Sequence, residues 1–208
     1  MNLSSTDATS ASHTPPLVWP EFTNDKAQLE WWLACVKAYR AEWAKPASLT
    51  PVNAQEIDAL EQRLACPLPT PLRTYHENIG VLDLSESLCS VTPVKYSNIE
   101  PLLDAYPGIT DILEDTPEST SLWTLVNQLI VFGDYLGNGN LWCFHRNTGE
   151  VWYFDHDSSP MLTKMFTDVG QYLDILMFMC LLFIHDEEGN EELLRERLGD
   201  EIVEKWMY

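Results

Sequence analysis

Basic residues are scarce in this sequence: 12 lysines and arginines stand against 32 aspartates and glutamates, for a formal net charge of -20 at pH 7. Nucleic acids and anionic membranes are both bound through basic patches. The composition therefore predicts no direct nucleic-acid binding and no docking on a membrane, and it favours a partner with a basic surface. A second interpretation stays open, because net charge governs solubility and association rather than fold: the acidic surface serves only to keep the protein in solution.

Closely spaced cysteines are also lacking. The five cysteines are odd in number, lie far apart and never form a Cys-x-x-Cys pair, so neither a disulfide framework nor a zinc knuckle is predicted. The first 16 residues contain no lysine, no arginine and no apolar run, which is unlike a secretory signal peptide. We therefore expect reduced cysteines, a cytoplasmic protein and a flexible tail over 1–20, since its Ser-, Thr- and Ala-rich start has little to bury.

No apolar run is long enough to cross a membrane. The run 175–184 ends at a group of acidic residues, and a spanning helix needs roughly 20 apolar residues. Phe166, Val169 and Leu173 extend the run at helical spacing. A helix that is apolar on every side is buried in a core, so we predict a central helix over 167–184.

A Trp-rich amphipathic helix is predicted near the start of the chain. Asn24 is a good N-cap, and Pro46 stops the helix. Its apolar side chains recur at steps of three, four and seven residues. They are Leu29, Trp32, Leu33, Val36 and Trp43.

Two further helices follow with clear end signals. Asn53 and Glu56 have the spacing of a capping box. Thr70 is suited to cap the next helix, Pro71 fits the first helical position, and Gly80 is a good C-terminal stop. Together these signals predict a helix, a proline-rich turn and a short helix.

The middle and the end of the chain carry weaker signals. Residues 81–97 are typical of strand and loop, and 97–106 of a short helix. Residues 111–127 contain either a helix around 122–126 or irregular cover. The acidic segment 186–208 has leucines and other apolar residues at helical spacing, which predicts one helix with a solvated acidic face.

From Gln128 the apolar pattern changes to a period of two. The runs "QLIVFGD", "NLWCFH" and "EVWYFD" are separated by turn sequences, which predicts an antiparallel meander. Alternation places apolar residues on both faces of this sheet, so the second face is either covered by another element, such as the Trp-rich helix, or kept for a partner. The two faces are Trp142, Phe144, Val151 and Tyr153, and Leu141, Cys143, His145, Trp152 and Phe154.

Two segments resemble the SUKH superfamily in its Smi/Knr-type branch. The stretch "IDALEQRLACPLPTPLRTYHENIG" is similar to the helix, Leu-Pro turn, helix and closing glycine of that family, and "VFGDYLGNGNLWCFHRNTGEVWYFDHD" to its hairpins and Asp-His-Asp strand end. The segment "FTDVGQYLDIL" stands where the family has its next helix. The resemblance covers 53–184, and the Trp-rich segment 21–45 lies outside it.

The resemblance implies an α+β fold. The expected sheet is mixed and largely antiparallel, contains the β-meander, and has helices packed mainly on one face, with an extra N-terminal helix and an acidic C-terminal helix. After the tail at 1–20, we expect an N-terminal helical extension over 21–50 and a single SUKH-like domain over 51–208.

The resemblance also implies a function. Family members act in bacterial competition as immunity proteins that bind and silence a cognate polymorphic toxin. Others are regulatory or scaffolding modules, which remains the alternative here, and no shared catalytic machinery comes with the fold. We therefore predict a non-enzymatic binding protein without a cofactor.

Metal binding is the first chemical alternative. Asp155, His156 and Asp157 lie near His145 and Asp134 in the predicted meander. In an extended segment the two aspartates point to one side and the histidine to the other, so the tripeptide alone does not close a metal site. A hydrolase that uses these acidic residues or a metal is kept only as a third hypothesis.

Nucleophilic catalysis has weaker support. Cys143 lies inside a predicted strand, and although His145 shares its face, no orienting acid or oxyanion-forming turn is evident. We therefore predict no catalytic residue.

A partner-binding surface at the central hairpin is the remaining prediction. It combines one aromatic face of the sheet with acidic residues at the strand ends. Should both faces prove to be covered, the binding surface is expected on the acidic helices instead. The predicted partner-binding residues are Asp134, Trp142, Phe144, Tyr153, Asp155 and Asp157.

Overall fold

The structure is a computed structural model, and it has the expected α+β fold: helices surround an open, six-stranded sheet whose strand pairs are all antiparallel. Parallel pairing is limited, in the described residues, to two isolated bridges. The structure describes residues 14–43, 49–80, 84, 86–114, 119–134, 137–185 and 190–207.

The sheet is built around the predicted meander. Its strand order is β1-β3-β4-β5-β6, and β2 pairs with the same edge of β3 as β1 does. The strands are β1 Ser87–Leu88, β2 Glu100–Pro101, β3 Leu129–Asp134, β4 Leu141–His145, β5 Val151–Phe154 and β6 Leu162–Phe166.

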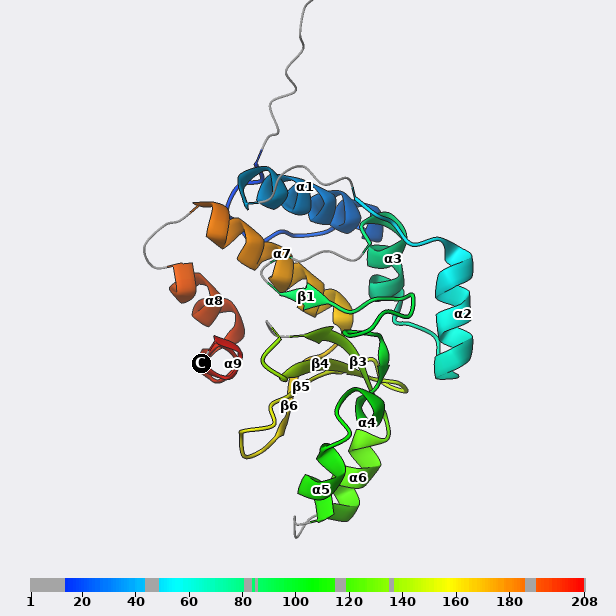
Figure 1. Cartoon of the computed structure of the whole chain (residues 1–208). Coiled ribbons are helices and arrows are strands. Elements are labelled where there is room, and N and C mark those ends of the chain that lie inside the picture. The colour runs from blue at the N-terminus through cyan, green and yellow to red at the C-terminus, as the bar shows by residue number, and fades with distance from the viewer. Residues whose placement is uncertain are drawn as a thin grey trace, which may run out of the picture.

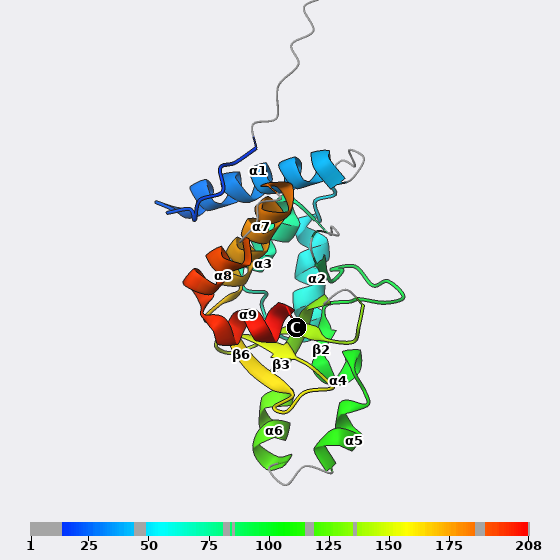
Figure 2. The same ribbon diagram turned by 90° about the vertical axis from the view of Figure 1, so that its left-hand side faces the viewer.

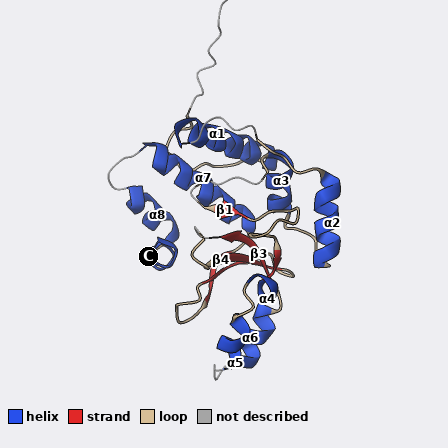
Figure 3. Cartoon of the chain, viewed as in Figure 1, coloured by secondary structure: helices blue, strands red, loops and turns tan. Residues whose placement is uncertain are grey.

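The helices make up about half of the chain and are coloured blue in Figure 3. They are α1 Asp25–Trp43, α2 Ala54–Leu64, α3 Thr70–Asn78, α4 Leu102–Ala105, α5 Ile109–Glu114, α6 Ser119–Val126, α7 Val169–His185, α8 Asn190–Leu198 and α9 Asp200–Met207. None of them, in the part of the chain that is described, is long and apolar enough to span a membrane.

Both faces of the sheet are covered, as Figures 1 and 2 show from two sides. On one face, Tyr172 of α7 lies with its ring centre 5.1 Å from that of Phe132 and 5.0 Å from that of Trp142. On the other, Tyr106 after α4 lies 4.9 Å from Phe154, and α5 and α6 extend beyond it. One of the two open interpretations placed the N-terminal helix over this second face, but the helix packs on α7 instead.

The pairing of the hairpin follows the predicted alternation. Trp142 pairs with Tyr153, and Cys143 pairs with Trp152. Neighbours across an antiparallel pair lie on the same face, so the two aromatic faces contain the predicted residues.

Strand β6 was not predicted. Phe166 was counted in the helical pattern that leads into the helix predicted over 167–184, but it pairs with Val151 of β5, and α7 begins only at Val169. The strand buries Leu162 and Phe166 and exposes Lys164 between them. Five residues give too short a pattern to distinguish a period of two from the helix that follows.

The first helix is fixed to the core by a half-buried carboxylate. Asp174 of α7 accepts a hydrogen bond from the indole nitrogen of Trp32 at 2.7 Å and bonds from Gln28 at 2.9 and 3.0 Å. Asn24 caps the helix through the backbone N–H of Ala27. Trp43, expected on the apolar face, is 62% exposed, because the last turn of α1 passes beyond the surface that the helix covers.

The predicted helix ends are mostly correct. Asn53 accepts from the backbone N–H of Glu56, whose side chain in turn binds the Asn53 amide at 2.6 Å. Thr70 is not a cap but the first helical residue, since Pro69 occupies the capping position. Gly80 has φ +87°, and a Cβ there would lie 1.9 Å from the carbonyl oxygen of Thr50.

Two predicted helices differ in the structure. The helix expected over 97–106 is reduced to α4, because Glu100 and Pro101 pair with β3. The single C-terminal helix is two helices, α8 and α9, which turn at Gly199 with φ +85°. The region 111–127 contains the end of α5, which begins at Ile109, and the whole of α6.

The tail predicted over 1–20 lies largely outside the described residues. Its described end packs on the core, where Trp19 stacks on Phe178 of α7 with ring centres 3.8 Å apart. The guanidinium group of Arg197 of α8 lies 5.5 Å from the Trp19 ring. This segment therefore packs against both α7 and α8.

Candidate partner-binding site

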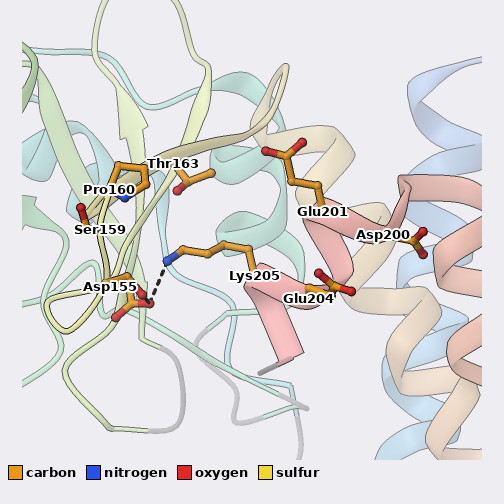
Figure 4. A pocket seen from close by; sticks show the side chains of 9 residues that line it. Asp155, Ser159, Pro160, Thr163, Asp200, Glu201, Glu204 and Lys205 are labelled. Carbon is orange, nitrogen blue, oxygen red and sulfur yellow. Dashed lines mark hydrogen bonds and ion pairs between the residues drawn. The ribbon is translucent and has the colours of Figure 1, made fainter.

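An acidic cleft of about 670 Å³ lies between the turn that joins β5 to β6 and the last helix, α9 (Figure 4). Its walls come from segments that are far apart in the sequence. We call it the acidic cleft, and its lining residues are Asp155, Ser158, Ser159, Pro160, Thr163, Asp200, Glu201, Glu204 and Lys205.

The turn side of the acidic cleft is organised by Asp155. Its side chain accepts hydrogen bonds from the hydroxyl of Ser158 and from the backbone N–H of Asp157, the latter at 3.1 Å. Short side chains with such acceptors stabilise turns by binding the backbone two or three residues on. The turn thereby presents one carboxylate toward the cleft at a fixed place.

Lys205 of α9 reaches across the cleft to this carboxylate. Its ammonium nitrogen lies 2.9 Å from Oδ2 of Asp155, and the two side chains are only 19% and 15% exposed. Burial raises the pKa of Asp155, but the hydrogen bonds from Ser158, Lys205 and the Asp157 backbone together outweigh it and lower the pKa below its usual value. Asp155 is therefore an anion at neutral pH.

The other wall of the cleft is the solvent face of α9. Val203 and Trp206 are buried, and their spacing of three residues turns that side of the helix to the core. Asp200 and Glu201 lie in the first turn, where negative charge interacts favourably with the helix dipole. The remaining acidic residue, Glu204, lies one turn further on.

Negative charge prevails in the cleft. Four of its lining residues are carboxylates and one, Lys205, is a cation. Arg195 of α8 neutralises part of this charge, since it lies 3.1 Å from Asp200 and 3.7 Å from Glu204. Glu201 has no ion-pair partner in the described part of the chain, so its charge is open to a ligand.

The aromatic residues of the predicted binding surface lie in the core. Trp142 is 0% exposed, Phe144 1% and Tyr153 2%. They face α7 and α9, where the Trp142 ring lies 4.9 Å from that of Trp206. The C-terminal helices cover this face in the folded chain, and a pattern read along the hairpin does not reveal that cover.

The acidic residues of the predicted surface do reach the exterior. Asp134 ends β3 and pairs with Leu141, which pairs with Phe154, so Asp134 and Asp155 lie at the same end of the sheet, two strands apart. Asp157 is 85% exposed. However, Asp134 lines a separate cavity of about 220 Å³ rather than the acidic cleft.

The residues considered for metal chemistry serve the turns. His156 binds the side chain of Asn140 at 3.0 Å and lies 3.2 Å from Asp157. His145 accepts, through Nδ1, from the backbone of Asn147 and Thr148 at 3.3 Å each. No group of three or more His, Cys, Asp and Glu side chains with metal-binding geometry occurs among the residues described.

Cys143 has the properties of a core thiol. It is 0% exposed, and burial raises its pKa well above the usual value. A thiol must ionise to act as a nucleophile, so this position is unfavourable for catalysis.

The α9 half of the cleft was not among the predicted site residues. The available signal was the acidic C-terminal segment, which was named as the alternative surface if both faces of the sheet were covered. The ion pair between Lys205 of this segment and Asp155 could not be predicted from the sequence, because 50 residues separate the two.

The comparisons with known proteins agree with the fold. The model of the SMI1/KNR4 family (SUKH-1) matches residues 51–175, which is more than half of the chain. The match ends within α7 and leaves α1, α8 and α9 outside. Searches of curated proteins and of solved structures each found no match.

Proposed function

The chain belongs to the SMI1/KNR4 family (SUKH-1), and from this membership we propose that it is an immunity protein that binds a cognate bacterial polymorphic toxin and neutralises it by stoichiometric contact. In this role it acts in the cytoplasm, protects its cell during bacterial competition, and needs neither a cofactor nor a catalytic residue. The proposed organisation is a SUKH-like domain over 51–208 with an N-terminal extension over 21–50.

The acidic cleft is the observation that supports this proposal. Its volume of about 670 Å³ is in the range of roughly 300–1,000 Å³ that is typical of ligand sites, enough for long side chains of a partner. Its open carboxylates favour lysine and arginine. The partner is therefore a toxin domain with a basic surface, such as a nuclease-like domain.

The proposed interface is centred on the cleft rather than on the aromatic hairpin. Asp157 contributes an exposed carboxylate from the β5–β6 turn, and Glu201 and Glu204 contribute from α9. Asp155 shapes the turn and is paired with Lys205. Asp134 lies at the edge of the interface. Charge complementarity of this kind raises the association rate more than it lowers the dissociation rate.

Co-expression tests the proposed function. The reading frame next to the gene is expressed in cells with and without this protein. We expect growth arrest that co-expression relieves. Absence of toxicity, together with recovery of native partners by pull-down, would overturn the immunity proposal in favour of the scaffolding alternative.

A charge reversal tests the proposed interface. Glu201→Lys should lower the association rate constant for the toxin on the order of tenfold. Glu42→Lys on α1 makes the same change in net charge at an exposed position outside the cleft and is the matched control. Equal effects of the two variants would show that only the overall charge matters, and would contradict a specific role for the cleft.

Salt dependence tests the electrostatic contribution. Raising the ionic strength from about 50 to about 500 mM should weaken toxin binding mainly through a slower association, because the Debye length falls. Association that is nearly independent of salt would contradict this contribution.

A further inference from the structure

A carboxyl group is buried in the core without a cation beside it. Glu86 lies between α3 and β1 and is 1% exposed. The hydroxyl of Tyr172 donates to its Oε2 at 2.9 Å, and the indole N–H of Trp206 donates to its Oε1. Within the described ranges of the chain, no lysine, arginine or histidine forms an ion pair with it.

Aromatic rings surround this carboxyl group. The ring of Trp206 lies 4.9 Å from that of Trp142 and 5.5 Å from that of Phe166. Burial raises the pKa of Glu86 to about 7, although hydrogen bonds from Trp206 and Tyr172 lower it. The indole of Trp142 lowers the pKa from close range without a well-aligned hydrogen bond. Desolvation is therefore the dominant effect on this group.

Few other titratable groups face Glu86. From α7 it meets Tyr172, whose own pKa is raised well above its usual value by burial, so that the phenol stays neutral. From β3 it meets Asp134, whose charge raises the Glu86 pKa. Lys205 of α9 pairs with Asp155 instead.

The hydrogen bond between Glu86 and Trp206 affects the acidic cleft, because Trp206 belongs to the helix that lines it. Trp206 lies beside Lys205 on α9, the helix that forms one wall of the acidic cleft. We infer that Glu86 is the positioning residue of this wall: by binding the Trp206 indole it holds α9 against the core, and so sets the shape of the cleft that receives the basic partner. The binding half of this inference rests on the function proposed above.

The ionisation of Glu86 makes the attachment of α9 sensitive to pH. When α9 leaves the core, water reaches the carboxyl group and its pKa returns toward the usual 4.5. The attached state thus binds the proton more tightly. Raising the pH through about 7 therefore favours release of α9, by up to about tenfold per pH unit above the pKa.

The NMR signal of the Trp206 indole tests this coupling without any toxin. In protein with isotope-labelled tryptophan, Trp206→Phe identifies the signal, and Trp43→Phe at an exposed site serves as the control. We expect the Trp206 signal to titrate with a midpoint near pH 7 and to lose that titration in Glu86→Gln. A signal that does not change between about pH 5.5 and about pH 8.5 would overturn the inference.

Cross-linking measures the position of the cleft wall. A zero-length carbodiimide joins Lys205 to Asp155 only while α9 is attached, and the product is quantified by mass spectrometry. At about pH 6, where the wild-type carboxyl group is largely protonated, Glu86→Gln should keep the yield because its amide oxygen still accepts from Trp206. Glu86→Leu and Trp206→Phe should each reduce it several-fold.

The outcomes separate the two proposals. If the cross-linking yield of Trp206→Phe equalled that of the wild type, the positioning role would be overturned, even if Glu86→Leu does not fold. If the coupling holds, toxin affinity should fall above pH 7 in the wild type and stay level in Glu86→Gln. A protein that passes the toxin-free tests but relieves no toxicity retains the inference about α9 and loses only the proposed function.

Discussion

The ammonium group of Lys205 lies 2.9 Å from a carboxylate oxygen of Asp155, and this ion pair joins the last helix to the end of β5 across the acidic cleft (Figure 4). Each side chain is less than one fifth exposed. The cleft therefore contains one cation of its own, which occupies the place where a partner's lysine would meet Asp155.

Breaking this pair should lower the free energy of unfolding. Lys205→Met keeps the aliphatic stem and leaves Asp155 with its two other donors, so a loss of about 1–2 kcal/mol is expected. Asp155→Asn should cost a similar amount. A double-mutant cycle in urea measures the coupling between them, which we expect at about 1 kcal/mol. Fully additive effects would contradict a direct interaction.

The coupling energy from this cycle should decrease in acid. Because the pKa of Asp155 is lowered below its usual 3.8, the pair contributes its full stability above that value and loses it as the pH falls through the lower, folded-state pKa. The coupling should therefore persist at pH 5 and vanish in stronger acid.

His76 should make the protein sensitive to mild acid. It is 0% exposed, neither ring nitrogen has a hydrogen-bond partner among the described residues, and burial lowers its pKa from 6.5 to about 4. The folded state binds the proton less tightly, so stability is complete above pH 6.5 and falls as the pH drops toward 4, by up to about 3 kcal/mol. His76→Leu should remove this slope, as urea titrations at several pH values would show.

Glu86 should show the opposite dependence of stability on pH. Its pKa is raised from 4.5 to about 7, so its contribution to stability is complete below pH 4.5 and is lost as the pH rises through 7. Glu86→Gln should therefore gain stability relative to the wild type with rising pH. Parallel pH profiles for the wild type and both variants would contradict the two assignments.

Gly80 should not tolerate a side chain. A Cβ at this position would lie 1.9 Å from the Thr50 carbonyl oxygen, and its φ is +87°. Gly149 has φ +75°, but no atom of the described residues lies within 4 Å of the added Cβ, which makes it a matched control. Gly149→Ala should cost about 1–2 kcal/mol for the backbone alone, whereas Gly80→Ala should cost several kcal/mol more or prevent folding. Equal melting temperatures of the two variants would disprove the close approach.

The N-terminal helix should unfold together with the rest of the chain. Trp32→Phe removes one of the two side chains that donate to Asp174, a carboxyl group whose pKa is already raised by burial, and should cost about 1–3 kcal/mol. Trp31→Phe leaves Asp174 untouched and should cost less. Circular dichroism should show a single transition in both variants, and an earlier separate loss of helix would mean that α1 is a detachable extension.

The sequence by itself determined the local structure and the class of fold. The cap at Asn53 depends on side chains three residues apart, and the faces of the meander depend on alternate residues along one strand. Such interactions are encoded in short stretches, so periodicity and end signals were sufficient to predict them. The family resemblance was also carried by contiguous segments, and it was confirmed over 51–175.

Only the tertiary structure decided which surfaces remain free. The meander has two apolar faces, and its sequence does not say that α7 and α9 cover one and α4 to α6 the other. The predicted aromatic residues were therefore placed on a binding surface, although Trp142 is 0% exposed. The contacts between Glu86 and Trp206 and between Asp155 and Lys205 join residues 120 and 50 positions apart. Their pairing follows from the shape of the whole core, because burial, which sets both the hydrogen bonds and the pKa of Glu86, is a property of the packed chain and not of any segment.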